Sequence, residues 1–295
     1  MAPYLMIIPA LIAIGFVHLY PSVRSIIMSF FDINLIKPNE PFVGMRNYVS
    51  FFQDKTNLIL LINTLFWAVS SVFISMAISI LIAVQLNKPF RGRGVLRATF
   101  LAPWVTPPVV ISMIWIQIFS RDRSPINGLL MKLGITKAPI AFLADPTLHF
   151  GFLSKPMMYL ILVNVWTILP FAIVMILSGL QTIPTELYEA AVIDGASKTK
   201  QFRFITFPLL MPVIEIVILL LFIWQFNSFN LNWMITNGGP MRTTEVMAVR
   251  IYLTAMQHYN YGYASAISVI MTLIVLVPAI FYIRRVTKEE FIGSD

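Results

Sequence analysis

The run 156–185, PMMYLILVNVWTILPFAIVMILSGLQTIPT, contains no Lys, Arg, Asp or Glu. A helix needs roughly 20 apolar residues to cross the ~30 Å hydrocarbon core of a bilayer, and this run exceeds that length. Uncharged runs that are also long enough lie at 1–23, 56–87, 98–120, 216–241 and 251–283. Since a lipid-embedded backbone must satisfy its own hydrogen bonds, these runs predict an all-α membrane protein with about six transmembrane helices.

The composition of the whole chain agrees with a membrane protein. Of 295 residues, 58% are hydrophobic and only 12% are charged, and the mean hydropathy is +0.81. The absence of cysteine excludes a disulfide scaffold, a thiolate metal site and a Cys nucleophile. The net charge of +8 could suit nucleic acid, but cytoplasmic loops of membrane proteins collect Lys and Arg, so we expect membrane lipid and no nucleic acid as partner.

The predicted spans are separated by polar segments. We place them at 4–30, 58–86, 98–119, 156–180, about 208–235 and about 264–283. The third contains Thr106-Pro107-Pro108, and two prolines within a span should kink or unwind the helix. Gly238-Gly239-Pro240 predicts a turn between the fifth span and the sixth.

The orientation depends on one loop. Lys88, Arg91, Arg93 and Arg97 follow the second span without an acidic residue, which favours a cytoplasmic loop and places both termini on the same side. Lys and Arg otherwise divide almost evenly between the two sides, and so do Asp and Glu. Basic residues outnumber acidic ones on the outer side, which therefore carries a surplus of positive charge. The first run lacks a basic start and an A-x-A cleavage site, and we expect a span rather than a signal peptide. It also has no basic residues ahead of it, which leaves open an earlier natural start.

The segment 186–208, ELYEAAVIDGASKTKQFRFITFP, is unusually polar and predicts two short helices with a break between them. Pro184 and Thr185 suit a helix start, and Leu187, Ala190 and Ala191 would share one face whose small residues allow close approach. A glycine, Gly195, should end this first helix, and Ser197 can cap a second one that continues into the fifth span. The alternative is an amphipathic connector that lies on the lipid headgroups.

The same segment carries a resemblance to a known family. Glu189-Ala190-Ala191, Gly195, Ile205, Phe207 and Pro208 resemble the motif E-A-A-x-x-x-G-x9-I-x-L-P of permease subunits in ATP-binding-cassette importers, with Phe207 where Leu is usual. QTIPTELYEAAVIDGAS, FVGMRNYVSFF, FNLNWMITNGGP and YGYASAISV are similar to carbohydrate permeases of the maltose-transporter type, and the NGGP loop is more similar to the maltose-F-like partner. The resemblance covers essentially the whole chain, as one permease domain (1–295) with a coupling segment (182–208).

The resemblance implies a transport subunit of the bacterial inner membrane rather than an enzyme. It would import an oligosaccharide with a second permease, two cytoplasmic ATPase subunits and an extracytoplasmic solute-binding protein. ATP and Mg would be bound by the ATPase subunits, with no cofactor in this chain, which has no G-x-x-x-x-G-K-[ST] motif. The ATPase-coupling residues would be Glu189, Ala190, Ala191, Asp194 and Gly195, on a cytoplasmic coupling helix between the fourth and fifth spans that seats in a groove of the ATPase.

Polar and aromatic residues near the outer end of the fifth span suggest a substrate path. Amides next to aromatic rings can bind a sugar by hydrogen bonding and stacking, and polar groups in a span usually face the bundle interior or water. The alternative is hydrogen bonding between helices. The candidates are Trp224, Asn227 and Asn230, followed by Asn164, Gln117, Trp166 and Tyr263.

Other readings of the sequence remain open. Glu215 lies within the fifth span, where a structural partner is favoured over a proton relay. The three histidines are scattered, so we expect no metal site. An ion-driven secondary transporter is the main alternative function, and a membrane-bound enzyme is the third. The surplus of outer positive charge fits an acidic cargo or an acidic binding protein equally well, so the oligosaccharide is either neutral or acidic.

Overall fold

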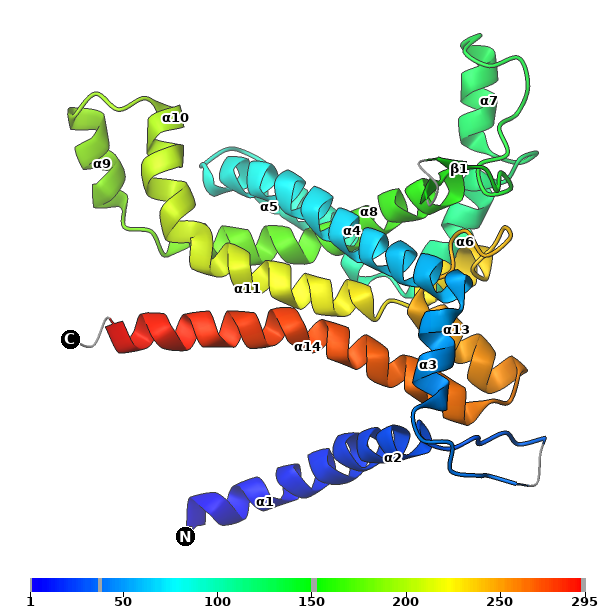
Figure 1. Cartoon of the computed structure of the whole chain (residues 1–295). Coiled ribbons are helices and arrows are strands. Elements are labelled where there is room, and N and C mark those ends of the chain that lie inside the picture. Colours follow the sequence, from blue (N-terminus) through cyan, green and yellow to red (C-terminus); the bar gives the residue numbers. More distant parts are fainter. Residues whose placement is uncertain (1, 37–38, 150–152, 293–295) are drawn as a thin grey trace. The chain divides into compact units, whose positions relative to one another are not determined.

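The structure, a computed structural model, describes residues 2–36, 39–149 and 153–292, and its regular structure is almost entirely helical (Figure 1). The helices are α1 Ala2–Ile14, α2 Tyr20–Met28, α3 Arg46–Gln53, α4 Lys55–Asn87, α5 Arg93–Val105, α6 Pro108–Phe119, α7 Pro125–Lys132, α8 Lys155–Gln181, α9 Thr185–Ile193, α10 Lys198–Gln201, α11 Phe207–Phe226, α12 Asn230–Thr236, α13 Met247–Tyr252 and α14 Tyr261–Ile292. Three π-helical turns, Gly15–Leu19, Phe202–Thr206 and Leu253–Gln257, join neighbouring helices. One short antiparallel pair, β1 Leu148–His149 and β2 Leu153–Ser154, precedes α8.

The prediction of about six membrane spans is confirmed. Within the described residues, five helical segments are long and apolar enough to cross a bilayer: Ile7–Met28, Lys55–Asn87, Lys155–Gln181, Lys198–Phe226 and Tyr261–Thr287. The pair α5 and α6 makes a sixth if the two halves count as one span. The second and fourth spans begin and end within a few residues of their predicted limits, whereas α14 extends beyond the predicted 264–283 at both ends.

The third span is broken where the two prolines predict a break. Helix α5 ends at Val105, α6 begins at Pro108, and their axes are bent by 95°. Thr106 and Pro107 between them are extended, with ψ of 130° and 138°, because each precedes a proline whose ring clashes with a helical conformation of the residue before it. The span begins at Arg93, earlier than the predicted residue 98.

The prediction of one continuous fifth span over 208–235 is wrong. Helix α11 ends at Phe226, and a separate helix, α12, begins at Asn230. The side-chain amide of Asn227 donates a hydrogen bond of 2.7 Å to the carbonyl of Ile223, so it competes with the backbone for an acceptor at the helix end. The polar residues that suggested a substrate path are therefore also the residues at which the helix stops.

The described chain divides into two compact units, residues 1–62 with 245–295 and residues 63–244. In the first unit, α2, α3 and α13 each pack against α14. The Asn47 side-chain amide donates to the carbonyls of Ser29 (2.9 Å) and Phe31 (3.0 Å), which satisfies acceptors at the end of α2. A partly buried ion pair lies between Arg250 and Glu245 (2.6 Å), and the hydrogen bond that Arg250 donates to the Glu245 carboxylate raises the pKa of Arg250.

In the second unit, α8 is the central helix, and its buried residues extend along most of its length. They pack with apolar residues of α4 and α11 in one core. Apolar burial does not hold helices together in lipid, so close packing must do so. Ser71, Ser75, Ser79 and Ala83 recur at every fourth position of α4 and are fully buried, which gives that helix a face of small residues. The sequence reading treated these residues only as part of an apolar run.

A close backbone approach in the first unit occurs at Gly262. Its N–H donates to the carbonyl of Ile33 (3.1 Å), and a Cβ at this glycine would lie 2.0 Å from the carbonyl oxygen of Phe31. That oxygen belongs to the backbone, so it cannot move away as the end of a side chain could. Only glycine therefore fits at the start of α14 beside this loop.

We predict that Gly262→Ala lowers the free energy of unfolding by about 1–3 kcal/mol, the usual cost of overpacking. The measurement is thermal unfolding of the purified protein in detergent. Gly128→Ala is the matched control, because no atom lies within 4 Å of its added Cβ. Equal melting temperatures for the two variants would contradict the close approach.

Candidate functional site

The segment between α8 and α11 forms a helical hairpin with a sharply defined turn. Helix α9 ends at Ile193, and Gly195 adopts a left-handed conformation with φ of 74°. Its N–H donates to the carbonyl of Val192 (3.0 Å), and the N–H of Ala196 donates to that of Ala191 (2.8 Å). These two hydrogen bonds form a Schellman motif, in which glycine avoids the penalty that a Cβ brings to this conformation. The predicted break at Gly195 is confirmed in position.

The second helix of the hairpin starts as its sequence indicates. The hydroxyl oxygen of Ser197 accepts a hydrogen bond from the N–H of Lys200, so it caps α10. A π-helical turn, Phe202–Thr206, then carries the chain into α11 without interrupting the helix. Two hydrogen bonds brace the hairpin: the hydroxyls of Tyr188 and Thr206 lie 2.9 Å apart, and the Gln201 amide donates to the carbonyl of Ala196 (3.0 Å).

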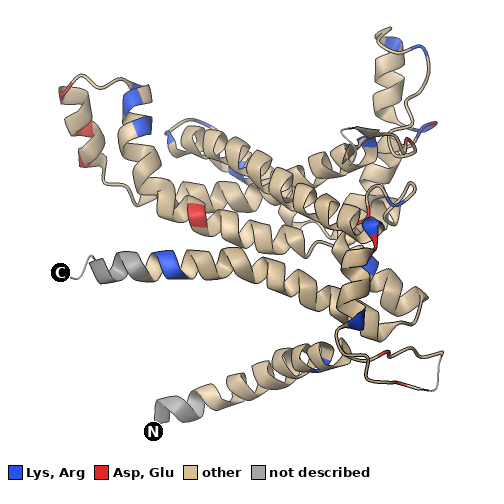
Figure 2. Ribbon diagram, viewed as in Figure 1, with Lys and Arg blue, Asp and Glu red and all other residues tan. Residues whose placement is uncertain are grey.

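The surface of this hairpin is open and divided by charge. None of the residues of α9 is buried; Glu189, Ala190, Asp194 and Gly195 are exposed and Ala191 is half-buried. Figure 2 shows acidic residues on α9 and basic residues on α10, whereas the long helices carry few charges. The five predicted coupling residues thus lie together on or next to one exposed helix.

Two apolar residues of α9 were missed by the sequence reading. The side chain of Val192 is 64% exposed and that of Ile193 is 86% exposed. They lie at the tip of the hairpin, beside the Gly195 turn. Their position after the alanine pair was visible in the sequence, and two large apolar residues next to a predicted turn indicate an apolar contact surface.

The candidate substrate-path residues of α11 lie near an aromatic row in the second unit. The Trp224 ring is half exposed, and its centroid lies 4.7 Å from that of the Phe171 ring of α8. The centroids of Phe171 and Trp104 of α5 are 5.8 Å apart. Asn227 and Asn230 are exposed at the break between α11 and α12. Only Trp224 of the three rings is close in sequence to these exposed amides, and the sequence did not indicate the contributions of Trp104 and Phe171.

The remaining candidates are dispersed. Asn164 is buried and donates to the side-chain oxygen of Gln225 (2.7 Å), so it joins α8 to α11 as the helix–helix alternative describes. Gln117 is exposed, and Glu215 is partly buried within α11. The ring centroids of Trp166 and Trp115 are 5.8 Å apart. Tyr263 lies in the first unit, where its hydroxyl accepts a hydrogen bond from Asn57 (2.8 Å).

Asn232 of α12, which the sequence reading passed over, is fully buried, and its side-chain atoms have no hydrogen-bond partner among the described residues. Within the same residues, no group of His, Cys, Asp or Glu is arranged to hold a metal ion.

We predict that Asn164→Leu and Gln225→Leu each lower the free energy of unfolding by about 1 kcal/mol, the scale of a hydrogen bond between membrane helices. The double variant should lose less than the sum, because each single variant leaves the other amide buried without its partner. Unfolding curves of the four proteins in detergent measure this cycle, and strictly additive losses would contradict the pairing.

Comparison with known proteins agrees with these observations. Residues 75–286 match the family described as binding-protein-dependent transport system inner membrane component. A probable ABC transporter permease protein of Brucella suis is 34% identical over 98% of this chain and 97% of its own length. The trehalose/maltose transport system permease protein MalF of Thermococcus litoralis is 33% identical over 95% of this chain and 92% of its own.

A solved structure shows the same fold. It is the crystal structure of a bacterial ABC transporter involved in the import of the acidic polysaccharide alginate. One of its chains superposes with a TM-score of 0.82 at 22% sequence identity, over 97% of this chain and 95% of that one.

Proposed function

Because this chain belongs to the family of inner membrane components of binding-protein-dependent transport systems, we propose that it is the permease subunit of an ATP-driven oligosaccharide importer. The chain is a transport subunit and not an enzyme, and hydrolysis of ATP with Mg belongs to partner subunits. A second permease, two ATPase subunits and a solute-binding protein complete the assembly. Residues 1–295 act as one permease domain, and both termini face the cytoplasm. The family favours this function over an ion-driven secondary transporter.

One observation carries the coupling role: the exposed α9 hairpin, at the end of the most buried helix of its unit. Residues 182–208 act as the coupling segment. Ala190 and Ala191 allow a partner surface to approach the backbone, and Val192 and Ile193 add exposed apolar area beside them. Glu189 and Asp194 offer carboxylates to basic groups of the ATPase. The chain enters the hairpin from α8 and leaves it into α11. A displacement of α9 is therefore transmitted to both spans.

Substrate binding is proposed at the end of α11. The exposed ring of Trp224 provides a stacking surface, and the exposed side chains of Asn227 and Asn230 provide hydrogen bonds to hydroxyl groups. The Asn227 amide nitrogen already donates one hydrogen bond to Ile223, so its side-chain oxygen is the group that it offers. Gln117 and Trp166 are exposed and are secondary candidates, whereas Asn164 supports the site through its hydrogen bond with Gln225. The named relatives include a permease of a trehalose/maltose system and a transporter for acidic alginate, so both neutral and acidic oligosaccharides remain in the proposal.

We predict that Gly195→Val leaves the protein inserted but strongly reduces ATP hydrolysis stimulated by the loaded binding protein in the reconstituted complex. A side chain at φ of 74° costs about 1–2 kcal/mol in strain, so the hairpin turn should open and α9 should seat poorly. Gly134→Val, at φ of 68° in a turn after α7, is the matched control and should keep stimulation. Unchanged stimulation of ATP hydrolysis in Gly195→Val would contradict the coupling role.

We also predict that Trp224→Ala weakens transport of the cognate sugar. Loss of a stacking ring should raise the half-saturating concentration about threefold to tenfold. The cognate sugar is first identified as the member of a neutral and acidic oligosaccharide panel that stabilises the binding protein against heat. Uptake into proteoliposomes then compares Trp224→Ala with Phe73→Ala, which removes an exposed ring from α4; the Phe73 side chain is 74% exposed and the Trp224 side chain 46%. The same loss in both variants would argue against a substrate path at Trp224.

A further inference from the structure

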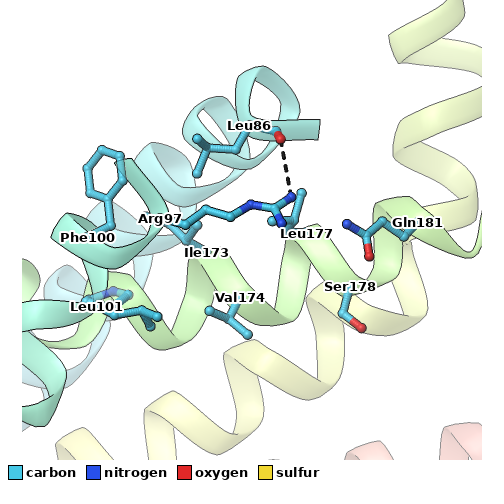
Figure 3. A pocket seen from close by; sticks show the side chains of 10 residues that line it. Leu86, Arg97, Phe100, Leu101, Ile173, Val174, Leu177, Ser178 and Gln181 are labelled. Carbon is cyan, nitrogen blue, oxygen red and sulfur yellow. Dashed lines mark hydrogen bonds between the residues drawn. The ribbon is translucent and has the colours of Figure 1, made fainter. Parts of the chain in front are cut away.

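A cavity of about 240 Å³ lies in the second unit, between α5 and α8 and beside the end of α4 (Figure 3). Its character changes along its length. Ser178 and Gln181 of α8 lie at one end and Phe100 and Leu101 of α5 at the other, with the Arg97 side chain between them (Figure 3). The cavity is therefore polar near the end of α8 and apolar toward the interior of the span.

Arg97 is the unusual residue of this cavity. Its Nε atom is buried without a hydrogen-bond partner, and its Nη2 atom lies 3.5 Å from the carbonyl oxygen of Leu86, at the limit of a hydrogen bond. Among the described residues Arg97 makes no ion pair, whereas the partly buried Arg250 binds Glu245 at 2.6 and 2.9 Å. A guanidinium within or near a membrane span is costly unless an anion accompanies it. The cavity thus has a place for a negative charge that the chain does not supply.

The lining of the cavity combines polar and apolar residues and therefore suits an amphiphilic anion. Guanidinium groups bind phosphate oxygens through paired N–H donors, and the Ser178 hydroxyl and Gln181 amide lie at the same end to complete such a contact. Leu101 and Val174 line the apolar part. The volume is below the about 300–1,000 Å³ of sites that enclose a drug-sized molecule, so it suits a headgroup and the first part of a chain.

We propose that this cavity binds an anionic phospholipid, with the phosphate on Arg97 and an acyl chain that leaves along Leu101 and Val174. The surroundings favour a lipid over a free anion. Both α4 and α8 end beside the cavity, and three basic residues follow α4 closely: Lys88 and Arg91 in the loop and Arg93 at the start of α5. Such basic residues draw anionic lipids to the inner surface of a membrane.

Binding at this place would also affect the proposed coupling segment, although the lipid site does not depend on the identity of the cargo. Gln181 is the last residue of α8, and only Thr182, Ile183 and Pro184 separate it from α9. A lipid phosphate held by Arg97 and Gln181 would fix the base of the hairpin. The composition of the membrane could then adjust how firmly α9 is presented.

The test uses the complete transporter, purified with phosphatidylglycerol and examined by native mass spectrometry for retained lipid. We expect Arg97→Gln to retain at least about tenfold less phosphatidylglycerol than the unchanged protein, because the phosphate loses a charge-assisted hydrogen bond. Arg91→Gln removes the same charge from the exposed loop and should lose clearly less lipid, because only the general attraction of the surface is reduced. Val174→Phe keeps Arg97 but fills the apolar part, and it should also lose the lipid.

Four outcomes would overturn the proposal. Equal losses in Arg97→Gln and Arg91→Gln would indicate attraction by net charge alone, without a site. Full retention in Val174→Phe would exclude an acyl chain in the cavity. Displacement of the lipid by millimolar inorganic phosphate would assign the site to a free anion. A thiol cross-link from Leu101→Cys to the second permease would show that protein fills the cavity instead.

Discussion

The bilayer requires every backbone N–H and C=O within it to find a partner in the chain, and the rest of this structure follows from that requirement. Long helices meet it without help, and the second unit departs from them at two places. Pro107 and Pro108 interrupt α5 and α6, and Asn227 ends α11 with a side-chain hydrogen bond to the helix. The half-helices that follow the two breaks, α6 and α12, pack against each other. The helices that follow the two breaks therefore lie next to each other, near the exposed side chains of Asn227 and Asn230.

The α9 hairpin satisfies the same requirement outside the helices. Its turn uses the Schellman pair at Gly195, and its second helix uses the Ser197 cap, so the chain reverses with few unpaired backbone groups. Most side chains of α9 are therefore not needed for the turn and remain exposed, with Tyr188 the exception because its hydroxyl pairs with Thr206. The exposed Val192 and Ile193 make that surface partly apolar, which suits a groove better than a layer of lipid headgroups. The proposed coupling role therefore depends on a rigid turn as much as on the charged residues of the segment.

Much of the fold could be predicted from the sequence, because uncharged runs and prolines act locally. The fourth span, the break at Pro107 and the turn at Gly195 all depend on residues within a few positions of each other. The end of α11 could not be placed, because Asn227 is compatible with a helix and only its hydrogen bond to Ile223 decides the matter. Contacts between distant segments were also out of reach. The Asn164–Gln225 pair and the row from Trp104 to Trp224 depend on helix packing that no local pattern reveals.

The most direct test of the central claim uses the absence of cysteine from this chain. A single Ala190→Cys variant, assembled with its ATPase subunits, is treated with a short thiol-to-amine cross-linker and analysed by peptide mass spectrometry. If α9 seats on the ATPase, Cys at 190 joins to a lysine of that subunit, whereas Leu133→Cys, at an exposed position after α7, does not. Cross-links from position 190 to lipid or to the binding protein, with none to the ATPase, would contradict the account.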